Sequence, residues 1–115
     1  MRNDKENIIV NKTEDFALAI IEFTEKIYEK HRYRMADQIF GSGTSIGANV
    51  SEAQNAESKA DFIHKMKIAA KEADETLYWL TLCKRSQFYP TDETIINQLE
   101  EIIKILSKII SSSKH

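Results

Sequence analysis

Residues 35–53 read MADQIFGSGTSIGANVSEA, and the apolar side chains of this stretch keep helical spacing across three glycines. Met35, Ile39, Ile46, Val50 and Ala53 would all lie on one face of a single helix. Each glycine weakens a helix by about 1 kcal/mol relative to alanine. Because this one helix carries three of them, we expect another backbone to pass very close to it.

The preceding segment has the pattern of an earlier helix. Phe16, Ile20, Phe23 and Ile27 follow one another at intervals of four, three and four residues, which places them on one helix face. Thr13 and the acidic residues directly after it are typical of a helix start. We therefore predict a helix over residues 13–31.

Two more helices are expected after the glycine-bearing one. Ser58 and Asp61 have the spacing of a capping box, with Asp in place of the usual Glu or Gln, and begin a helix that should end near residue 87. Thr91 and the acidic residues after it begin a fourth helix. The apolar series of this last helix runs from Ile95 to Ile109.

Length and composition fit one domain built from these helices. The chain has 115 residues, three Gly and one Pro, and its 42% apolar content can form a core without disulfides or metals. With short connections and no strand pattern, we predict an all-α, antiparallel up-and-down four-helix bundle over residues 13–110. A flexible arm at residues 1–12 and a frayed end at residues 111–115 would flank it.

The charge balance limits the kinds of partner. Sixteen Lys and Arg against 18 Asp and Glu give a formal net charge of −2, so any contact with nucleic acid requires a local patch. Tyr33, between two arginines, could stack on an unpaired base. A solvated charged turn is the alternative. The patch that we predict comprises Lys26, Lys30, His31, Arg32, Tyr33 and Arg34, joined by Lys59, Lys65 and Lys67.

The third and fourth helices carry more apolar surface than one bundle requires. On a helical wheel, several apolar residues of the third helix lie opposite its core stripe, and others widen the apolar arc of the fourth. Such a cluster favours self-association, although an irregular bundle could cover these residues itself. The predicted interface comprises Ile68, Tyr78, Trp79, Leu82, Ile96 and Ile103.

A polar seam borders the apolar stripe of the glycine-bearing helix. It comprises Gln38, Ser45, Asn49 and Glu52. If these side chains are buried they must be hydrogen-bonded, and they could then bridge to a neighbouring helix or subunit. The alternative is a solvated helix face.

The same helix carries a motif of a known family. Gln38-Ile39 followed by Thr44–Ala53, TSIGANVSEA, resembles the pattern Q-L, then S-I-x-A-N-[IV]-x-E-G, of the four-helix-bundle proteins of the 23S rRNA intervening-sequence family. The resemblance continues at Asp61-Phe62 and Ile68-Ala69, and then at Glu75, Tyr78 and Leu80. Two places depart from it: Ala53 stands where the pattern has Gly, and Lys71-Glu72 where many members have Gly-Ser.

This resemblance implies a homopentameric ring of four-helix bundles. Relatives of the family include the accessory protein of diversity-generating retroelements, which resembles a nucleic-acid-binding partner of a reverse transcriptase. An RNA or DNA partner is therefore also suggested by the resemblance.

Residues capable of catalysis or metal binding lack the partners that such chemistry needs. Asp61 and His64 form one isolated pair, and Cys83 has no histidine near it in the sequence. The segment 41–47 lacks the Gly-Lys-Ser/Thr ending of a phosphate-binding loop. We therefore predict no catalytic residues, no metal and no cofactor.

Together these features favour a non-catalytic oligomer that binds the backbone of RNA or DNA. The alternative is an oligomeric scaffold that recruits another protein and binds no nucleic acid. A single cysteine, a charged N-terminal segment unlike a signal peptide and the lack of a long apolar stretch predict a cytoplasmic protein without membrane contact.

Overall fold

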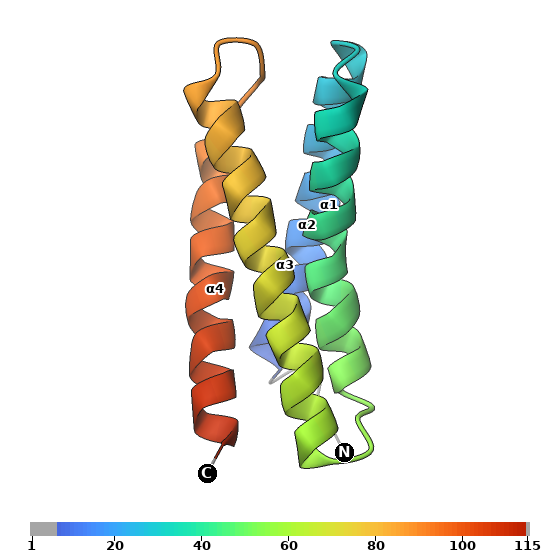
Figure 1. The fold of residues 1–115 in the computed structure, drawn as a ribbon, viewed down its shortest axis with the longest axis vertical. Coiled ribbons are helices and arrows are strands. Elements are labelled where there is room, and N and C mark those ends of the chain that lie inside the picture. The colour runs from blue at the N-terminus through green and yellow to red at the C-terminus, as the bar shows by residue number, and fades with distance from the viewer. Residues whose placement is uncertain (1–6, 115) are drawn as a thin grey trace.

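The computed structural model describes residues 7–114, which form four helices in an antiparallel bundle (Figure 1). The helices are α1 (Ile8–Glu29), α2 (Tyr33–Ala53), α3 (Lys59–Arg85) and α4 (Glu93–Ser113). Within this part of the chain no strand is present. The predicted all-α bundle is therefore confirmed, and it measures 45 × 21 × 20 Å.

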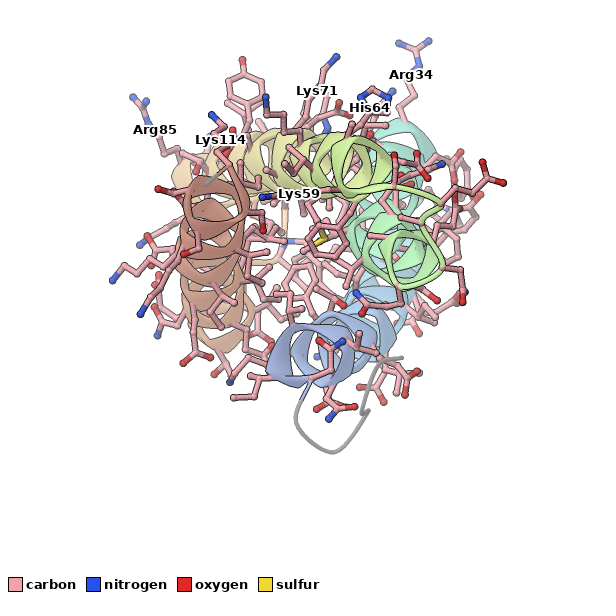
Figure 2. All side chains as sticks on the ribbon, turned by 90° about the horizontal axis from the view of Figure 1, so that it is seen from below. Arg34, Lys59, His64, Lys71, Arg85 and Lys114 are labelled. Carbon is pink, nitrogen blue, oxygen red and sulfur yellow. The ribbon has the colours of Figure 1, made fainter. Side chains whose placement is uncertain are left out.

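The helices occupy the corners of a square when the bundle is viewed along its axis (Figure 2). Both α1 and α3 pack against α2 and α4. The α1–α2 turn and the α3–α4 connection therefore lie at one end, and the α2–α3 connection at the other (Figure 1). We call the first of these the turn end and the second the terminal end.

The apolar stripes predicted from the sequence meet in the core. Ile20, Ile46 and Leu99 are fully buried, as are most members of the other stripes. One polar contact joins two helices inside this core: the Thr76 hydroxyl donates to the Ser42 hydroxyl at 2.8 Å. A buried pair with satisfied partners fixes the register of α3 on α2.

Three helix ends differ from the predictions. The helix α1 begins at Ile8 rather than residue 13, because buried Ile9 extends the apolar stripe by two turns. The predicted arm is thus helical over residues 8–12, and its residues 1–6 lie outside the described chain. At its other end α1 stops at Glu29, two residues early. The Asp92 carboxylate, rather than Thr91, caps α4 by accepting from the Ile95 N–H.

The C-terminal prediction needs a similar correction. Residues 111–113 continue α4 instead of fraying, and the Ser113 hydroxyl donates to the Ile109 carbonyl at 2.7 Å. His115 lies outside the described residues. By contrast, Ser58 caps α3 as predicted, because its hydroxyl accepts from the Asp61 N–H at 3.0 Å.

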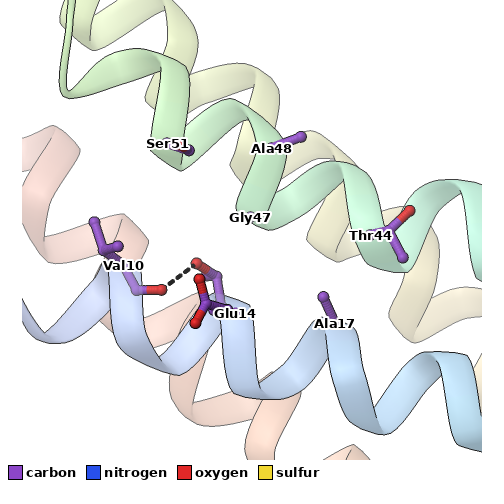
Figure 3. A pocket seen from close by; sticks show the side chains of 8 residues that line it. Val10, Glu14, Ala17, Thr44, Gly47, Ala48 and Ser51 are labelled. Carbon is purple, nitrogen blue, oxygen red and sulfur yellow. Dashed lines mark hydrogen bonds between the residues drawn. The ribbon is translucent and has the colours of Figure 1, made fainter.

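The glycines of α2 differ in their surroundings. A Cβ at Gly47 would lie 3.2 Å from the backbone carbonyl oxygen of Thr13, and a Cβ at Gly43 would lie 2.9 Å from the Ile20 side chain. At Gly41 nothing lies within 4 Å. The expected close approach of another backbone is therefore found at Gly47, where Ala17 of α1 lies opposite the small side chains of Thr44, Ala48 and Ser51 on α2 (Figure 3).

Candidate nucleic-acid interface

The predicted basic turn closes α1 with a Schellman motif. The His31 N–H donates to the Tyr28 carbonyl at 2.9 Å, and the Arg32 N–H donates to the Ile27 carbonyl at 3.4 Å. His31 occupies the left-handed position of this motif with φ 61°, where glycine is the usual residue. The chain therefore holds a side chain in a costly backbone conformation at this point.

That side chain contacts the next aromatic ring. His31 Nδ1 and Tyr33 Oη lie 2.6 Å apart, and the Tyr33 ring also packs on Tyr28 with centroids 4.8 Å apart. The Tyr28 hydroxyl in turn donates to the Asp37 carboxylate at 3.3 Å, and the Asp37 charge raises the pKa of Tyr28. Tyr33 thus contacts His31 and Tyr28, while the residue stays 46% exposed.

The α3–α4 connection brings two more aromatic residues to the turn end. The Arg32 guanidinium lies over Phe88 at 5.6 Å from the ring centroid and over Tyr89 at 6.0 Å. Phe88 is 61% exposed. Sequence reasoning did not assign either residue to the site, and the only available signal was a pair of adjacent aromatic residues in a connection between helices.

Two hollows flank Tyr33, and their charges are opposite. One, of about 280 Å³, is lined by His31, Arg32, Tyr33, Arg34, Met35 and Tyr89. The other, of about 630 Å³, is lined by Glu25, Tyr28, Glu29 and Tyr33. We call them the basic hollow and the acidic hollow. A phosphate group is attracted to the first and repelled by the second.

The predicted basic patch is not one surface. Lys26, Lys30 and Arg34 are exposed at the turn end. Lys59, Lys65 and Lys67 lie in the first third of α3, toward the terminal end of a bundle 45 Å long. Lys65 Nζ is moreover 2.9 Å from Glu52, and this hydrogen bond raises the pKa of Lys65. The structure therefore groups Lys26, Lys30, His31, Arg32, Tyr33 and Arg34 and separates them from Lys59, Lys65 and Lys67.

The polar seam lies on a partly exposed face of α2. The Ser45 hydroxyl donates to the Gly41 carbonyl at 2.6 Å, and the Asn49 amide donates to the Ser45 carbonyl at 2.8 Å. Gln38 and Glu52 are exposed. Within the described residues, the ion pair of Glu52 with Lys65 therefore links the seam to α3.

The residues of the predicted oligomer interface are covered to different degrees. Tyr78 is 58% exposed, and Ile68 and Leu82 are half-buried. Trp79 and Ile103 pack partly against the core, and Ile96 is only 7% exposed. The bundle thus covers part of this set itself.

The outward face of α3 nevertheless forms one continuous stripe. Its residues follow at alternating intervals of four and three, and the labelled members point away from the bundle (Figure 2). Apolar and charged members are interspersed along it, an arrangement that suits contact between helices. The stripe, which we call the outer stripe, comprises His64, Ile68, Lys71, Glu75, Tyr78, Leu82 and Arg85.

Two titratable side chains of α3, Cys83 and Glu72, have pKa values raised by burial. Burial raises the pKa of Cys83 to about 11, which keeps this thiol protonated. Burial and the charge of Glu75 raise the pKa of Glu72. Among residues 7–114, no three His, Cys, Asp or Glu side chains are grouped to hold a metal ion. None of the described helices is long and apolar enough to cross a membrane.

Comparison with known proteins agrees with the sequence resemblance. The family profile described as 23S rRNA-intervening sequence protein matches residues 5–111. A crystal structure from Bacteroides thetaiotaomicron, of a protein of unknown function from the S23 ribosomal protein family, is 43% identical with a TM-score of 0.84. The match covers 89% of this chain and 97% of that one. No curated protein matches the chain.

Proposed function

Because the chain belongs to the 23S rRNA-intervening sequence protein family, we propose that it is a non-catalytic oligomer that binds nucleic acid through its turn end. The observation that carries the proposal is the group of exposed cations at the α1–α2 turn, beside the exposed ring of Tyr33. Lys and Arg side chains bind phosphates, and this contact dominates the affinity of most nucleic-acid-binding proteins. The free cysteine supports a cytoplasmic location.

The cations at the turn differ in how free they are to bind phosphate. Arg32 is already stacked near Phe88 and Tyr89, and Lys84 is paired with Glu93 at 2.6 Å. Lys30 and Arg34 are exposed on either side of the turn. We therefore assign the main phosphate contacts to these two residues.

The test compares two double variants of equal charge. Lys30→Gln with Arg34→Gln removes two cations at the turn end, and Lys104→Gln with Lys108→Gln removes two exposed cations from α4. Fluorescence anisotropy with labelled RNA and DNA is measured over a range of salt concentrations. The first variant should lower the salt slope by about 1.5 for each bound subunit, and the second should leave it unchanged. Equal slopes for both variants and wild type would refute the assignment.

Self-association is a further part of the proposal, with a pentameric ring as the family's expected assembly. The outer stripe supports it, since Tyr78 is exposed between the half-buried side chains of Ile68 and Leu82. Light scattering of Tyr78→Glu should give smaller particles than wild type. Leu18→Glu is the matched control, because Leu18 is also 58% exposed but lies on α1. If only the control dissociates, the interface lies on α1 instead.

A scaffold that recruits another protein is the second candidate function. Leu18, Ile21 and Phe40 are exposed apolar residues on α1 and α2, outside both the turn end and the outer stripe. Exposed apolar surface of this kind is typical of protein contacts. The scaffold is favoured if neither RNA nor DNA binds at low salt.

A further inference from the structure

Aromatic side chains are concentrated at the turn end. Tyr28, Tyr33 and Phe88 are all exposed there, and Tyr89 is half-buried next to them. Tyr28 lies in the last turn of α1 and Tyr33 is the first residue of α2, whereas Phe88 and Tyr89 lie in the connection between α3 and α4. Exposed rings next to guanidinium groups are typical of surfaces that stack on bases.

The basic hollow has the size for one small planar group. Its volume of about 280 Å³ lies just below the range of roughly 300–1,000 Å³ found for drug-sized ligands. Tyr33 and Tyr89 supply rings to its wall, and Arg32 and Arg34 supply positive charge. A planar, electron-rich group joined to a phosphate matches both features.

Charge decides which of the two hollows such a ligand enters. The acidic hollow is larger, but Glu25 and Glu29 in its wall repel a phosphate that enters with a base. The basic hollow has no carboxylate among its lining residues. A nucleotide is therefore directed to the basic hollow.

The ring that would receive a base is already held in place. Tyr33 is hydrogen-bonded to His31 and packed on Tyr28, and His31 is kept in its position by the left-handed backbone of the turn. A side chain ordered before binding loses less conformational entropy when the ligand arrives. This gives a physical reason for a strained His31 in a turn where glycine would cost less.

We infer that the basic hollow binds an unpaired nucleobase, so that the protein selects single-stranded nucleic acid over duplex. This inference rests on the proposed function, because Lys30 and Arg34 must hold the neighbouring phosphates. In a duplex the faces of the bases are covered by their neighbours, and only an unpaired base can stack on Tyr33. RNA and DNA share this chemistry.

The first experiment needs no variant. Anisotropy is measured with a labelled polyuridine strand, a polythymidine strand, an abasic DNA strand of the same length and a duplex of the same length. The strands with bases should bind about tenfold more tightly than the abasic strand, which carries the same phosphates. Preference for polyuridine or for polythymidine identifies the natural source as RNA or DNA. Equal affinity for the thymidine and abasic strands would overturn the inference.

The second experiment tests the residue. Tyr33→Leu should abolish the preference for bases over the abasic strand and leave the affinity for the abasic strand unchanged. Phe40→Leu is the matched control, because Phe40 is 46% exposed like Tyr33 and lies two turns further along α2. Tyr89→Leu tests the opposite wall and should weaken the preference as well. A preference that persists in both tyrosine variants would refute the assignment to this hollow.

The two proposals fail in different ways. If no strand and no duplex binds at low salt, the proposed function itself is wrong. If the duplex and the abasic strand bind as tightly as the strands with bases, the phosphate contacts stand and only the base site is wrong.

Discussion

The three glycines of α2 provide a sharp test of the packing between α1 and α2. Replacing helical glycine by alanine stabilises a protein by about 1 kcal/mol where space allows. Gly41→Ala should give this full gain, because nothing lies within 4 Å of the new Cβ. For a domain of this size the melting temperature should rise by about 4 °C.

The other two substitutions should lose this gain. At Gly43 the new Cβ would lie 2.9 Å from one Ile20 carbon and 3.0 Å from another, and Ile20 is fully buried and stiff at its branched carbon. Overpacking costs about 1–3 kcal/mol, so Gly43→Ala should be neutral to about 2 kcal/mol destabilising. Gly47→Ala meets a backbone oxygen at 3.2 Å and should also fall below wild type, because the backbone of α1 must give way by a few tenths of an ångström.

Urea unfolding followed by circular dichroism measures all three variants. Protein concentration is kept constant, because self-association would stabilise the folded state by mass action. If alanine stabilises equally at all three positions, close helix approach does not explain the glycines. If Gly41→Ala destabilises, the space beside this residue is occupied in the assembled protein.

Three further predictions concern local features. His31→Gly should raise the unfolding free energy by about 1 kcal/mol, because glycine adopts φ 61° without strain; a loss of stability in urea would contradict this. Asp92→Ala should cost about 1 kcal/mol in the same assay, whereas Thr91→Ala should cost almost nothing, and equal effects would argue against the observed cap. Burial raises the pKa of Cys83 from 9.0 to about 11, so at pH 8 this thiol should react with a disulfide reagent about a hundredfold more slowly than an exposed cysteine. The Cys83 thiol ionises at lower pH in the unfolded chain than in the folded protein, so the unfolding free energy should fall as the pH rises from about 9 to about 11. Fast labelling of Cys83 in the folded protein would refute its burial.

Much of the fold follows from hydrophobic periodicity. The stripes around Phe16, Ile46 and Leu99 are long and regular, and most of their members are buried as predicted. The positions of helix ends depend on weaker, local signals, and the errors in the predicted helices therefore lie at their ends. Thr91 and Asp92 are both good capping residues, so the sequence does not decide between them, whereas in the structure the extended Asp92 accepts from the Ile95 N–H.

The candidate site was predicted only in part, because part of it depends on tertiary structure. The basic turn is contiguous in the sequence, so Arg32, Tyr33 and Arg34 could be identified together. Phe88 and Tyr89 come close to Arg32 only because two antiparallel helices return to the same end of the bundle. The same geometry separates Lys67 from the site, because an antiparallel bundle places the start of α3 at the opposite end from the α1–α2 turn.

The position of the chain ends has a practical consequence for immobilisation. Asn7 and Lys114 border α1 and α4 at the terminal end, and the α1–α2 turn lies at the far end of the 45 Å bundle (Figure 1). A molecule tethered to a sensor chip through a linker after its last helix would present the turn to the flowing solution. A dye attached at the same place would sit far from Tyr33, so its signal would report rotation of the whole particle rather than quenching by the bound strand.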